Sequence, residues 1–568
     1  MSTTPIVECV PNVSEGRDEA VIRAIADQVE TVDGVALLDV EPGAATNRTV
    51  ITFAGPPEAV VEAAVRLARK AAELIDMTTH QGEHPRFGAL DVCPLVPVSG
   101  ITMEETVEYA RELGRRLGEE VGLTVYLYEH AATRPERRNL AVVRQGEYEA
   151  LPERLKDPEW RPDFGPAEFQ PRSGATAVGA RDFLAAFNVN LNTTSTRRAN
   201  AIAFDVREKG RILREGDPLT GPIVRDEEGN PVWKPGSLKA VKAIGWYIEE
   251  YGICQVSMNL TDLSTTPIHV AFDETCERAR DRGVRVTGSE LVGLVPLRAM
   301  LDAGRYFLRK QKRSTGVSDR ELVKIAVRSM GLDELAPFEP EKKIVEYALE
   351  ARNPRKRLVD RTLRGFVEET ASESPAPGGG SVAAAVGALG AALGAMVANL
   401  SSHKRGWDER WEEFSEVAER GKAHHDRLLA LVDADTDAFD ALMAAWRLPE
   451  SGDAEKAAKE EAVQAAVLAA VEVPLSVMRE ALASMDVAAE MAEKGLPASV
   501  SDAGVAALCA RAAVRAAGLN VRINLPQLTD EGRAEAIRRE AAALEEEAER
   551  RETAVLARVD EALREQEA

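Results

Sequence analysis

Cysteine is scarce in this chain of 568 residues, and the few cysteines are not clustered. The five are Cys9, Cys93, Cys254, Cys276 and Cys509, and no CxxC spacing occurs among them. Scattered cysteines of this kind indicate a reducing compartment and argue against a structural zinc site. We therefore expect no metal.

Positive charge is also in short supply. The 71 lysines and arginines are outnumbered by 94 acidic residues, which gives a net charge of -23. Nucleic acid is excluded as an expected partner, because phosphate binding needs a basic face. A small anion can still bind in a locally basic pocket. The N-terminal residues MSTTPIVECVPN lack the basic region and apolar run of a signal peptide, so we expect a cytoplasmic protein.

Long apolar runs are nearly absent. The exception, residues 382–400, is uncharged but consists largely of alanine and glycine. These residues give a weak membrane-insertion signal, although their small side chains allow helices to approach closely. We predict a buried, tightly packed helix here and no membrane span.

The remaining pattern predicts a multidomain chain. Strand and helix signals alternate over residues 1–180 and again over 181–335, which is typical of two α/β sandwich subdomains with mixed, ferredoxin-like sheets. Residues 336–356 are interpreted as a linker with a short helix. Residues 357–568 show helical periodicity with short turns, which predicts an all-α helical-bundle domain.

Individual elements follow from local periodicity and turn residues. Ser14 is the predicted cap of an early helix. Residues 212–236, rich in glycine and proline, predict an inserted surface hairpin or loop. The expected strands are 6–10, 35–40, 49–54, 89–98, 124–128, 183–191, 254–260 and 284–287. The expected helices are 57–75, 103–121, 196–208, 238–251, 267–282, 296–309, 408–446, 454–494, 500–518 and 530–566.

The first candidate site is the loop at residues 80–91. Gly82 and Pro85 exclude a regular helix there, and stiff loops between packed elements often carry catalytic groups. His84 has an ordinary pKa near 6.5, which suits proton transfer at neutral pH. The alternative is a structural loop histidine. A zinc pair with His80 needs helical geometry, so it is not expected.

Acidic residues near His84 are candidates to orient its ring. They are Glu83, Asp91 and Asp39. The stretch 39–49, which contains Asp39, is itself interpreted as turn chemistry, although polar groups at a strand end can also reach a shared cleft.

The second candidate site lies in the helical half. The glycine-rich residues 375–384 open a helix, where free N–H groups can hold an anion or small side chains can permit close packing. The spacing of Asp433, Asp435 and Asp437 is that of the start of a calcium loop. Such a loop needs glycine at its sixth position and glutamate at its twelfth, and both positions are alanine here. On a helix, Asp435 would face away from the other two. A buried acid there is costly unless it does chemistry, and the alternative is three solvated acids.

Several motifs resemble a known enzyme family. VECVPNVSEG at 7–16, LLDVEPG and TNRTV within 37–50, and HQGEHPRFGALDVCP at 80–94 are similar to glutamate formimidoyltransferases. APGGGSVAAA at 376–385, LVDAD at 431–435 and VRINL at 521–525 are similar to formimidoyltetrahydrofolate cyclodeaminases. Their order is that of the bifunctional formimidoyltransferase-cyclodeaminases.

The resemblance implies a folate enzyme of histidine degradation and one-carbon metabolism. The first half would transfer the formimino group of N-formimidoyl-L-glutamate to tetrahydrofolate. The second would form 5,10-methenyltetrahydrofolate and release ammonia. It implies His84 and Asp435 as catalytic residues, and small-molecule substrates including folate polyglutamate. It also implies a homo-oligomer, for example an octamer. The implied folate-binding residues are Gly165, Pro166, Ala167, Glu168, Phe169, Gln170, Pro171, Arg172, Ser173, Gly174 and Asp205.

Two departures and three rivals accompany this reading. The insertion at 212–236 is longer than in animal members of the family, and Val13 stands where phenylalanine is typical. Basic residues near the implied folate site are candidates to bind the glutamate carboxylates of folate. They are Arg197, Arg198, Lys209 and Arg211. The rivals are an N-formylglutamate-using transferase, a methenyltetrahydrofolate cyclohydrolase, and a non-catalytic protein that binds folate and oligomerises.

Overall fold

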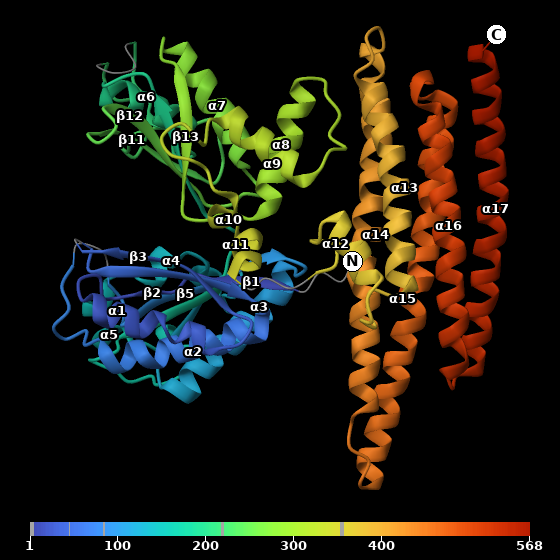
Figure 1. Ribbon diagram of the computed structural model, residues 1–568. Helices are drawn as coiled ribbons and strands as arrows, with labels where there is room; N and C mark the ends of the chain where they lie inside the picture. The colour runs from blue at the N-terminus through green and yellow to red at the C-terminus, as the bar shows by residue number, and fades with distance from the viewer. Residues whose placement is uncertain (1–4, 45, 83–85, 217–220, 353–356, 568) are drawn as a thin grey trace. The chain divides into compact units, whose positions relative to one another are not determined.

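The computed structural model describes residues 5–44, 46–82, 86–216, 221–352 and 357–567 (Figure 1). The chain divides into two compact units. The α/β unit comprises Met1–Ala303 and Ala326–Pro354, and the helical unit comprises Gly304–Ile325 and Arg355–Ala568. Segment Gly304–Ile325, which the sequence pattern grouped with the second α/β subdomain, therefore clusters with the helical unit.

The first part of the α/β unit is built on a seven-stranded mixed sheet with β3 paired to β4 and the order β1-β4-β2-β5-β7-β6. Only the β5–β7 and β6–β7 pairings are parallel. Strand β7, which is alanine-rich and completely buried, lay in a region without predicted structure. The strands are β1 (Ile6–Cys9), β2 (Asn12–Val13), β3 (Ala36–Gly43), β4 (Arg48–Gly55), β5 (Leu90–Ser99), β6 (Thr124–Glu129) and β7 (Ala175–Ala180).

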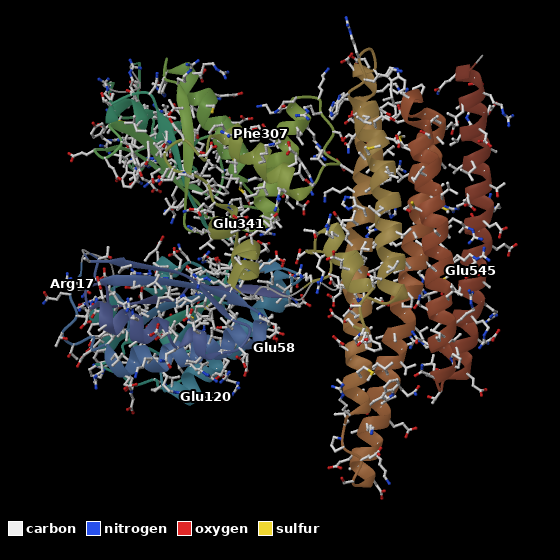
Figure 2. All side chains as sticks on the ribbon, in the orientation of Figure 1. Arg17, Glu58, Glu120, Phe307, Glu341 and Glu545 are labelled. Carbon is white, nitrogen blue, oxygen red and sulfur yellow. The ribbon has the colours of Figure 1, made fainter. Side chains whose placement is uncertain are left out.

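Helices α1 (Glu19–Ala26), α2 (Pro57–Leu74) and α3 (Met103–Arg116) cover one face of this sheet (Figure 1). Their apolar stripes recur at helical spacing and pack on the strands, whereas exposed Glu58 and Glu120 point outward (Figure 2). The prediction that Ser14 caps α1 is wrong. Asp18 accepts the first amide protons of α1, and Ser14 Oγ donates instead to the carbonyl oxygen of Gly88 at 2.7 Å.

Short helices lie against the opposite face of the sheet. The cluster they form is centred on Phe87, Val92 and Tyr126. The helices are α4 (Leu140–Val143) and α5 (Glu147–Arg154), and α11 (Val345–Arg352) packs on β3.

The second part of the α/β unit has the ferredoxin-like order β8-α6-β11-β12-α7-β13, with sheet order β11-β12-β8-β13. Its three strand pairings are antiparallel. Strands β9 and β10 pair antiparallel within the segment predicted as an inserted hairpin or loop, and residues 217–220 between them lie outside the described residues. The elements are β8 (Ala185–Leu191), α6 (Thr196–Val206), β9 (Arg211–Ile212), β10 (Trp233–Lys234), β11 (Val241–Ile248), β12 (Ile253–Leu260), α7 (Ile268–Asp281), β13 (Val286–Val292) and α10 (Pro340–Lys343). Helices α8 (Leu297–Lys310) and α9 (Asp319–Met330) each contain residues of both units.

The predicted helix at 238–251 is wrong, because this segment is strand β11. Val241 and Ala243 are buried, while Lys242 and Ile244 are exposed, so the side chains alternate with a period of two. A Cβ on Gly245 would overlap the backbone of α6, so only glycine allows this strand to pack against that helix.

Long antiparallel helices fill the helical unit, as predicted. Helix α13 packs closely on α16: a Cβ on Gly390 would lie 2.9 Å from the carbonyl oxygen of Ala506. Within the described part of the chain, three helices, namely α13, α15 and the segment containing α16, are long and apolar enough to cross a membrane by length and composition alone. The helices are α12 (Leu363–Thr370), α13 (Gly379–Ser402), α14 (Trp411–Trp446), α15 (Asp453–Lys494), α16 (Val500–Asn524) and α17 (Glu531–Glu567).

Candidate active sites

The first candidate site is the corner between α2 and β5. His84 and Glu83 fall outside the described residues, but both flanks of their loop are fixed. His80 is buried, and its Nε2 lies 2.8 Å from the carbonyl oxygen of Asn47. Arg86 donates to the carbonyl oxygen of His80. His80 therefore holds this loop against the start of β4.

A buried ion cluster lies beside this corner. Asp91 is only 1% exposed, and its Oδ2 accepts from the guanidinium groups of both Arg48 and Arg144. Arg48 Nε also donates to Asn12 Oδ1 at 2.9 Å. Burial lowers the pKa of Arg48, and the charge of Asp91 opposes that effect. Among the described residues, Asp91 Oδ1 and Arg144 Nε have no hydrogen-bond partner.

Sequence reasoning did not identify the two arginines. Arg48 belongs to the stretch 39–49, which was interpreted as a turn. Arg144 lies in a region without the apolar periodicity of a helix or strand. Asp91, proposed as an orienter of His84, accepts from these two guanidinium groups, and its role toward His84 stays a prediction. The pairing joins residues 53 positions apart in the chain, and no local pattern in the sequence signals it.

The predicted folate stretch, residues 165–174, runs from the edge of β6 to the corner. At its start, Thr124 Oγ1 donates to the carbonyl oxygen of Pro166 at 2.8 Å. At its end, the amide of Ala89 donates to the carbonyl oxygen of Ser173 at 2.8 Å. Gly174 has a φ of +66°, and a Cβ there would overlap the carbonyl oxygen of Phe87. The C-terminal end of the stretch is therefore packed against the residues that follow His84.

The middle of this stretch is anchored by aromatic and polar contacts. The rings of Phe169 and Tyr148 lie 5.5 Å apart, and Tyr148 Oη donates to the carbonyl oxygen of Pro171 at 2.6 Å. Gly174 N donates to the carbonyl oxygen of Gln170. The side chains left exposed along the stretch are those of Ala167, Glu168, Pro171 and Arg172. They are accessible to a ligand, and their role in folate binding stays a prediction.

Asp205 lies on α6 in the second subdomain, where it holds two arginines. Its carboxylate pairs with Arg211 and accepts from Arg282 Nε at 2.8 Å. Arg198 donates to the carbonyl oxygen of Arg282 at 2.8 Å. Lys209 lies 4.3 Å from the centre of the Trp233 ring. Three of the four basic residues considered for folate carboxylates thus have partners within the protein, and the role of Asp205 stays a prediction.

The second candidate site is formed where α13 begins beside the middle of α14. Asp435 Oδ2 accepts from the backbone N–H of Ser381 at 2.8 Å and from Ser381 Oγ at 3.0 Å. A Cβ on Gly380 would overlap Asp435 Oδ1. The glycine-rich helix start therefore does both things that the sequence left open: its amide binds an anion, here the carboxylate of Asp435, and its missing side chains permit close approach.

Asp435 differs from its two neighbours on α14. Asp433 accepts from the backbone N–H of Leu358 at 2.6 Å, and Asp437 is exposed. Asp435 alone of the three lines a cavity of about 150 Å³. Burial raises its pKa above the ordinary value, against the opposing effect of the Ser381 hydrogen bonds. The cavity is lined by Pro375, Ala376, Gly378, Gly379, Asp435, Thr436, Phe439, Leu442, Ala470, Asn520, Ile523 and Asn524.

This arrangement suits acid catalysis. A carboxyl group whose pKa is raised by burial can carry a proton to a departing nitrogen. Once it has given that proton, the two donors of Ser381 stabilise the carboxylate. Within the described residues, no group of three or more histidine, cysteine, aspartate or glutamate side chains is arranged to hold a metal ion.

Comparisons with family models cover most of the chain. The N-terminal subdomain of the formiminotransferase domain matches residues 6–181, and the formiminotransferase domain matches residues 186–350. A third model, formiminotransferase-cyclodeaminase, matches residues 362–543.

Relatives of known name match the same chain. A formimidoyltransferase-cyclodeaminase of Sus scrofa is 44% identical over 555 residues, covering 98% of this chain and 99% of the relative. A glutamate formimidoyltransferase of Streptococcus pyogenes serotype M1 is 42% identical over 304 residues, 54% of this chain and 93% of the relative. A methenyltetrahydrofolate cyclohydrolase of Methylorubrum extorquens is 40% identical over 174 residues, 31% of this chain and 84% of the relative. Since the first match extends over nearly the full length of both proteins, the chain belongs to the formimidoyltransferase-cyclodeaminase family.

Proposed function

We propose that this protein catalyses two consecutive folate reactions. It transfers the formimino group of N-formimidoyl-L-glutamate to tetrahydrofolate, and then cyclises the product to 5,10-methenyltetrahydrofolate with release of ammonia. Full-length relatives named for both activities support the assignment. The observation that carries the second activity is Asp435, a partly buried acid that lines a cavity at a helix start.

In the cyclisation, the protonated carboxyl of Asp435 acts as the acid. N10 of the folate attacks the formimino carbon and forms the new C–N bond, while the C=N bond to the terminal nitrogen becomes single and the N10 proton passes to that nitrogen to give an amino group. The bond from the carbon to the amino group then breaks as Asp435 gives its proton, ammonia leaves, and a lone pair of the remaining folate nitrogens forms the C=N bond of methenyltetrahydrofolate. The carboxylate left behind is held by the backbone N–H and hydroxyl of Ser381.

In the transfer, the formimino carbon is bonded for a moment to both N5 of tetrahydrofolate and the glutamate nitrogen. One proton must leave N5 and one must reach the glutamate nitrogen, and an imidazole suits both steps. We assign this role to His84 by its motif. The guanidinium groups of Arg48 and Arg144, which share Asp91 beside the corner, favour a substrate that carries carboxylates.

Several finer points belong to the same proposal. Tetrahydrofolate acts as a co-substrate, including its polyglutamate forms, and no metal takes part. The protein is a cytoplasmic homo-oligomer without a membrane span that serves histidine degradation. The scattered cysteines and the strongly acidic composition support a reducing compartment and no nucleic-acid partner.

The test is an assay that reads both reactions. The full-length protein is given formimidoylglutamate and tetrahydrofolate, and methenyltetrahydrofolate absorbance and ammonia are followed. His84→Ala is expected to abolish transfer and to spare cyclisation of added 5-formimidoyltetrahydrofolate. Asp435→Ala is expected to do the reverse. Asp437→Asn, two residues away but exposed, is the matched control and should keep both activities.

Each rival predicts a different result. Turnover of N-formylglutamate in place of the formimino donor would favour the formyl-transferase reading. Hydrolysis of methenyltetrahydrofolate without ammonia release from the formimino compound would favour the cyclohydrolase reading, which has a relative in Methylorubrum extorquens. Folate binding with no turnover at all would favour the non-catalytic reading. Normal rates of both reactions in either catalytic variant would overturn that residue's assignment.

A further inference from the structure

Two asparagines of helix α16 line the cavity that holds Asp435. They are Asn520 and Asn524, which lie one helical turn apart on the same side of α16. The buried residues of this helix are all alanine, glycine or valine. Asparagine disfavours a helix interior, because its side chain competes for main-chain hydrogen bonds. Its repeated use on this side of α16 therefore points to a role in the cavity.

The amide nitrogens of both asparagines are already used within the protein. Asn520 Nδ2 donates to the carbonyl oxygen of Ala516 at 3.0 Å, and Asn524 Nδ2 donates to that of Ala470 at 2.9 Å. A main-chain acceptor thus fixes which end of each amide is nitrogen. Within the part of the chain that the structure describes, no donor reaches Asn520 Oδ1, so this oxygen is left to accept a hydrogen bond from a ligand.

Glycine at position 379 gives the Asn520 amide its place at the start of α13. A Cβ on Gly379 would lie 3.2 Å from Asn520 Nδ2 and 3.4 Å from Asn520 Oδ1. The next residue, Gly380, makes room in the same way for the carboxyl of Asp435. Two successive glycines therefore allow an amide from α16 and an acid from α14 to approach the same turn of α13.

The cavity itself is small and partly apolar. Its volume of about 150 Å³ is below the roughly 300–1,000 Å³ of sites that enclose a whole small molecule, so it suits only the reacting end of a folate. Phe439, Leu442 and Ile523 supply apolar lining. In such surroundings a hydrogen-bond acceptor that faces another acceptor is costly, because neither can find a proton.

The polar groups of the cavity match a nitrogen better than an oxygen. The terminal nitrogen of a formimino group has a lone pair and an N–H bond, so it can accept from the protonated carboxyl of Asp435 and donate to Asn520 Oδ1 at the same time. A formyl oxygen can accept from Asp435 but has no proton for Asn520. The terminal nitrogen keeps at least one N–H bond at every stage until ammonia leaves.

We propose that Asn520 is a specificity-determining residue of the cyclisation, whose Oδ1 accepts a hydrogen bond from the terminal nitrogen of 5-formimidoyltetrahydrofolate and so selects this compound over 5-formyltetrahydrofolate. This inference rests on the proposed function. The hydrogen bond strengthens as Asp435 gives its proton, because the departing nitrogen then becomes positively charged. Asn520 therefore contributes to the rate as well as to the choice of substrate.

The test replaces Asn520 by leucine, which has a similar branched shape but no acceptor. Ammonia release from added 5-formimidoyltetrahydrofolate is measured in the full-length protein, with 5-formyltetrahydrofolate as a competing ligand. In Asn520→Leu, kcat/KM should fall by about tenfold or more, the size of effect expected when a hydrogen bond to a charged group is lost. The ratio of the inhibition constant of the formyl compound to KM, here called the preference ratio, should fall by a similar factor.

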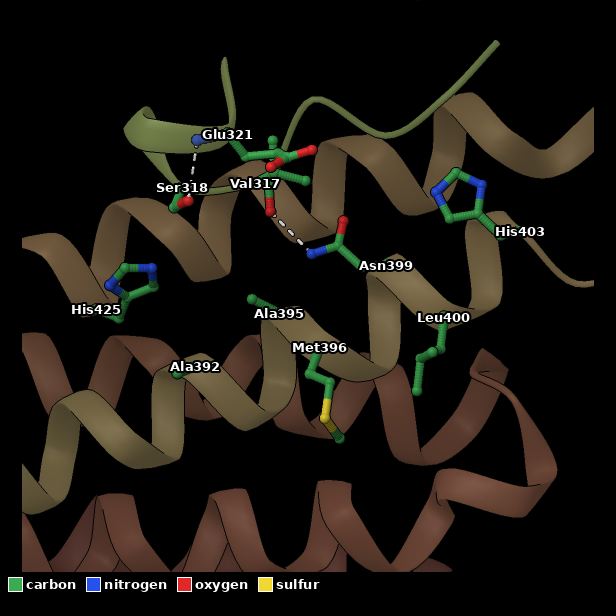
Figure 3. A pocket seen from close by; sticks show the side chains of 11 residues that line it. Val317, Ser318, Glu321, Ala392, Ala395, Met396, Asn399, Leu400, His403 and His425 are labelled. Carbon is green, nitrogen blue, oxygen red and sulfur yellow. Dashed lines mark hydrogen bonds between the residues drawn. The ribbon is translucent and has the colours of Figure 1, made fainter. Parts of the chain in front are cut away.

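Asn399 provides the matched control, because it is an asparagine of the same unit that lies outside the Asp435 cavity. Its Nδ2 also donates to a main-chain carbonyl oxygen, that of Gly316 at 2.8 Å, and it lines a groove of about 460 Å³ beside α13 (Figure 3). Asn399→Leu removes this hydrogen bond, so it should lower the temperature of thermal unfolding. Both kcat/KM and the preference ratio should stay unchanged, which separates a loss of stability from a loss of recognition.

Aspartate at position 520 gives a second readout. Asn520→Asp keeps an acceptor in place, so the preference ratio should stay within about threefold of its original value. It also adds a negative charge close to Asp435, which raises the pKa of that acid. Because cyclisation needs the protonated acid, the alkaline limb of the pH–rate profile should move to higher pH. A packing role for Asn520 predicts no such shift.

Two results would overturn the inference. One is an Asn520→Leu protein with unchanged kcat/KM and preference ratio. The other is an Asn520→Leu protein that loses rate while the preference ratio stays the same, since altered packing would then explain the loss. Formimino transfer and circular dichroism of each variant verify its folding. If the unmodified protein releases no ammonia, the proposed function fails and this inference fails with it. If it does release ammonia, the preference ratio decides the inference alone.

Discussion

Glu8 is a buried acid in the strand that opens the α/β unit. Its neighbours Val7 and Cys9 belong to the apolar core, so Glu8 points to the opposite face of the sheet, where it is 3% exposed. Burial raises its pKa from 4.5 to about 7; Arg181 lowers it and Glu346 raises it further. The folded protein therefore holds Glu8 neutral at pH values where the unfolded chain ionises it.

The sign of the resulting pH dependence follows from this raised pKa. The stabilisation is fully present below pH 4.5 and is lost as pH rises to about 7. At about 1.4 kcal/mol per pKa unit, the free energy of unfolding should fall by roughly 3 kcal/mol across that window. Glu8→Gln removes this contribution. The free energy of unfolding is measured by chemical unfolding at pH 5 and pH 8. The value for the variant minus that for the unmodified protein should increase by about 3 kcal/mol from pH 5 to pH 8. An unchanged difference would contradict a buried neutral Glu8.

Ser381 sets the acidity of the proposed catalytic acid. Its hydroxyl and its backbone N–H both donate to Asp435, which lowers the pKa that burial raises. Ser381→Ala removes the hydroxyl, so the pKa of Asp435 should rise further. Cyclisation needs the protonated acid, and its rate falls as pH rises through that pKa. The alkaline limb of the pH–rate profile should therefore move to higher pH.

The control for this shift is Ser484→Ala. Ser484 is another buried helical serine whose hydroxyl donates to a main-chain carbonyl oxygen, that of Ala481, and not to an acid. It should leave the profile where it is. A Ser381→Ala protein that loses rate equally at every pH would assign Ser381 a packing role only.

At the scale of elements, the start of α13 shows whether steric overlap or helix propensity determines the effect of replacing a glycine by alanine. Alanine favours a helix interior by about 1 kcal/mol over glycine, so propensity alone predicts that Gly380→Ala stabilises α13. A Cβ at this position would overlap Asp435 Oδ1, so the carboxyl must move. We expect Gly380→Ala to abolish cyclisation while formimino transfer continues. Gly452→Ala, with nothing within 4 Å of its new Cβ, should change neither rate. Normal ammonia release by Gly380→Ala would show that the position of Asp435 is not critical.

The periodicity of apolar residues predicted most helices and strands, because one face of each is buried. It failed where the same residues suit both the helical and the strand period. In 238–251, the apolar residues Leu238, Val241, Ile244 and Ile248 suit a helix. The structure instead makes β11 and leaves Ile244 exposed by 53%, since tertiary pairing with β12 overrides the local signal. Strand β7 was missed for another reason: its alanines and glycine carry little strand preference, although all six residues are buried.

The candidate sites divide along the same line. Asp435 was predictable, because its motif and the glycines before it are local features of the sequence. The partnership of Arg48 and Arg144 through Asp91 was not, because it exists only after distant segments meet. The structure gives the surroundings of Asp435 and of both flanks of the His84 loop, and the roles of His84, Asp435, Asp205 and residues 165–174 stay predictions.

At the scale of the whole molecule, the two proposed sites belong to two compact units with separate cores. A substitution in one unit should therefore leave the other unit's reaction intact. His84→Ala alone makes no formimino intermediate, and Asp435→Ala alone cannot cyclise it. Mixed in equal amounts, they should convert formimidoylglutamate and tetrahydrofolate to methenyltetrahydrofolate, because the intermediate released by one protein can reach the other.

The time course of product formation by this mixture shows whether the intermediate passes from one protein to the other. Product absorbance should appear after a lag that shortens as total protein rises, since the intermediate must first accumulate and diffuse. The unmodified protein should show a shorter lag at the same concentration. A double variant, His84→Ala with Asp435→Ala, should give no product and so exclude contamination. A mixture that stays inactive, although each variant keeps its own single reaction, would mean that the intermediate never leaves the protein that makes it.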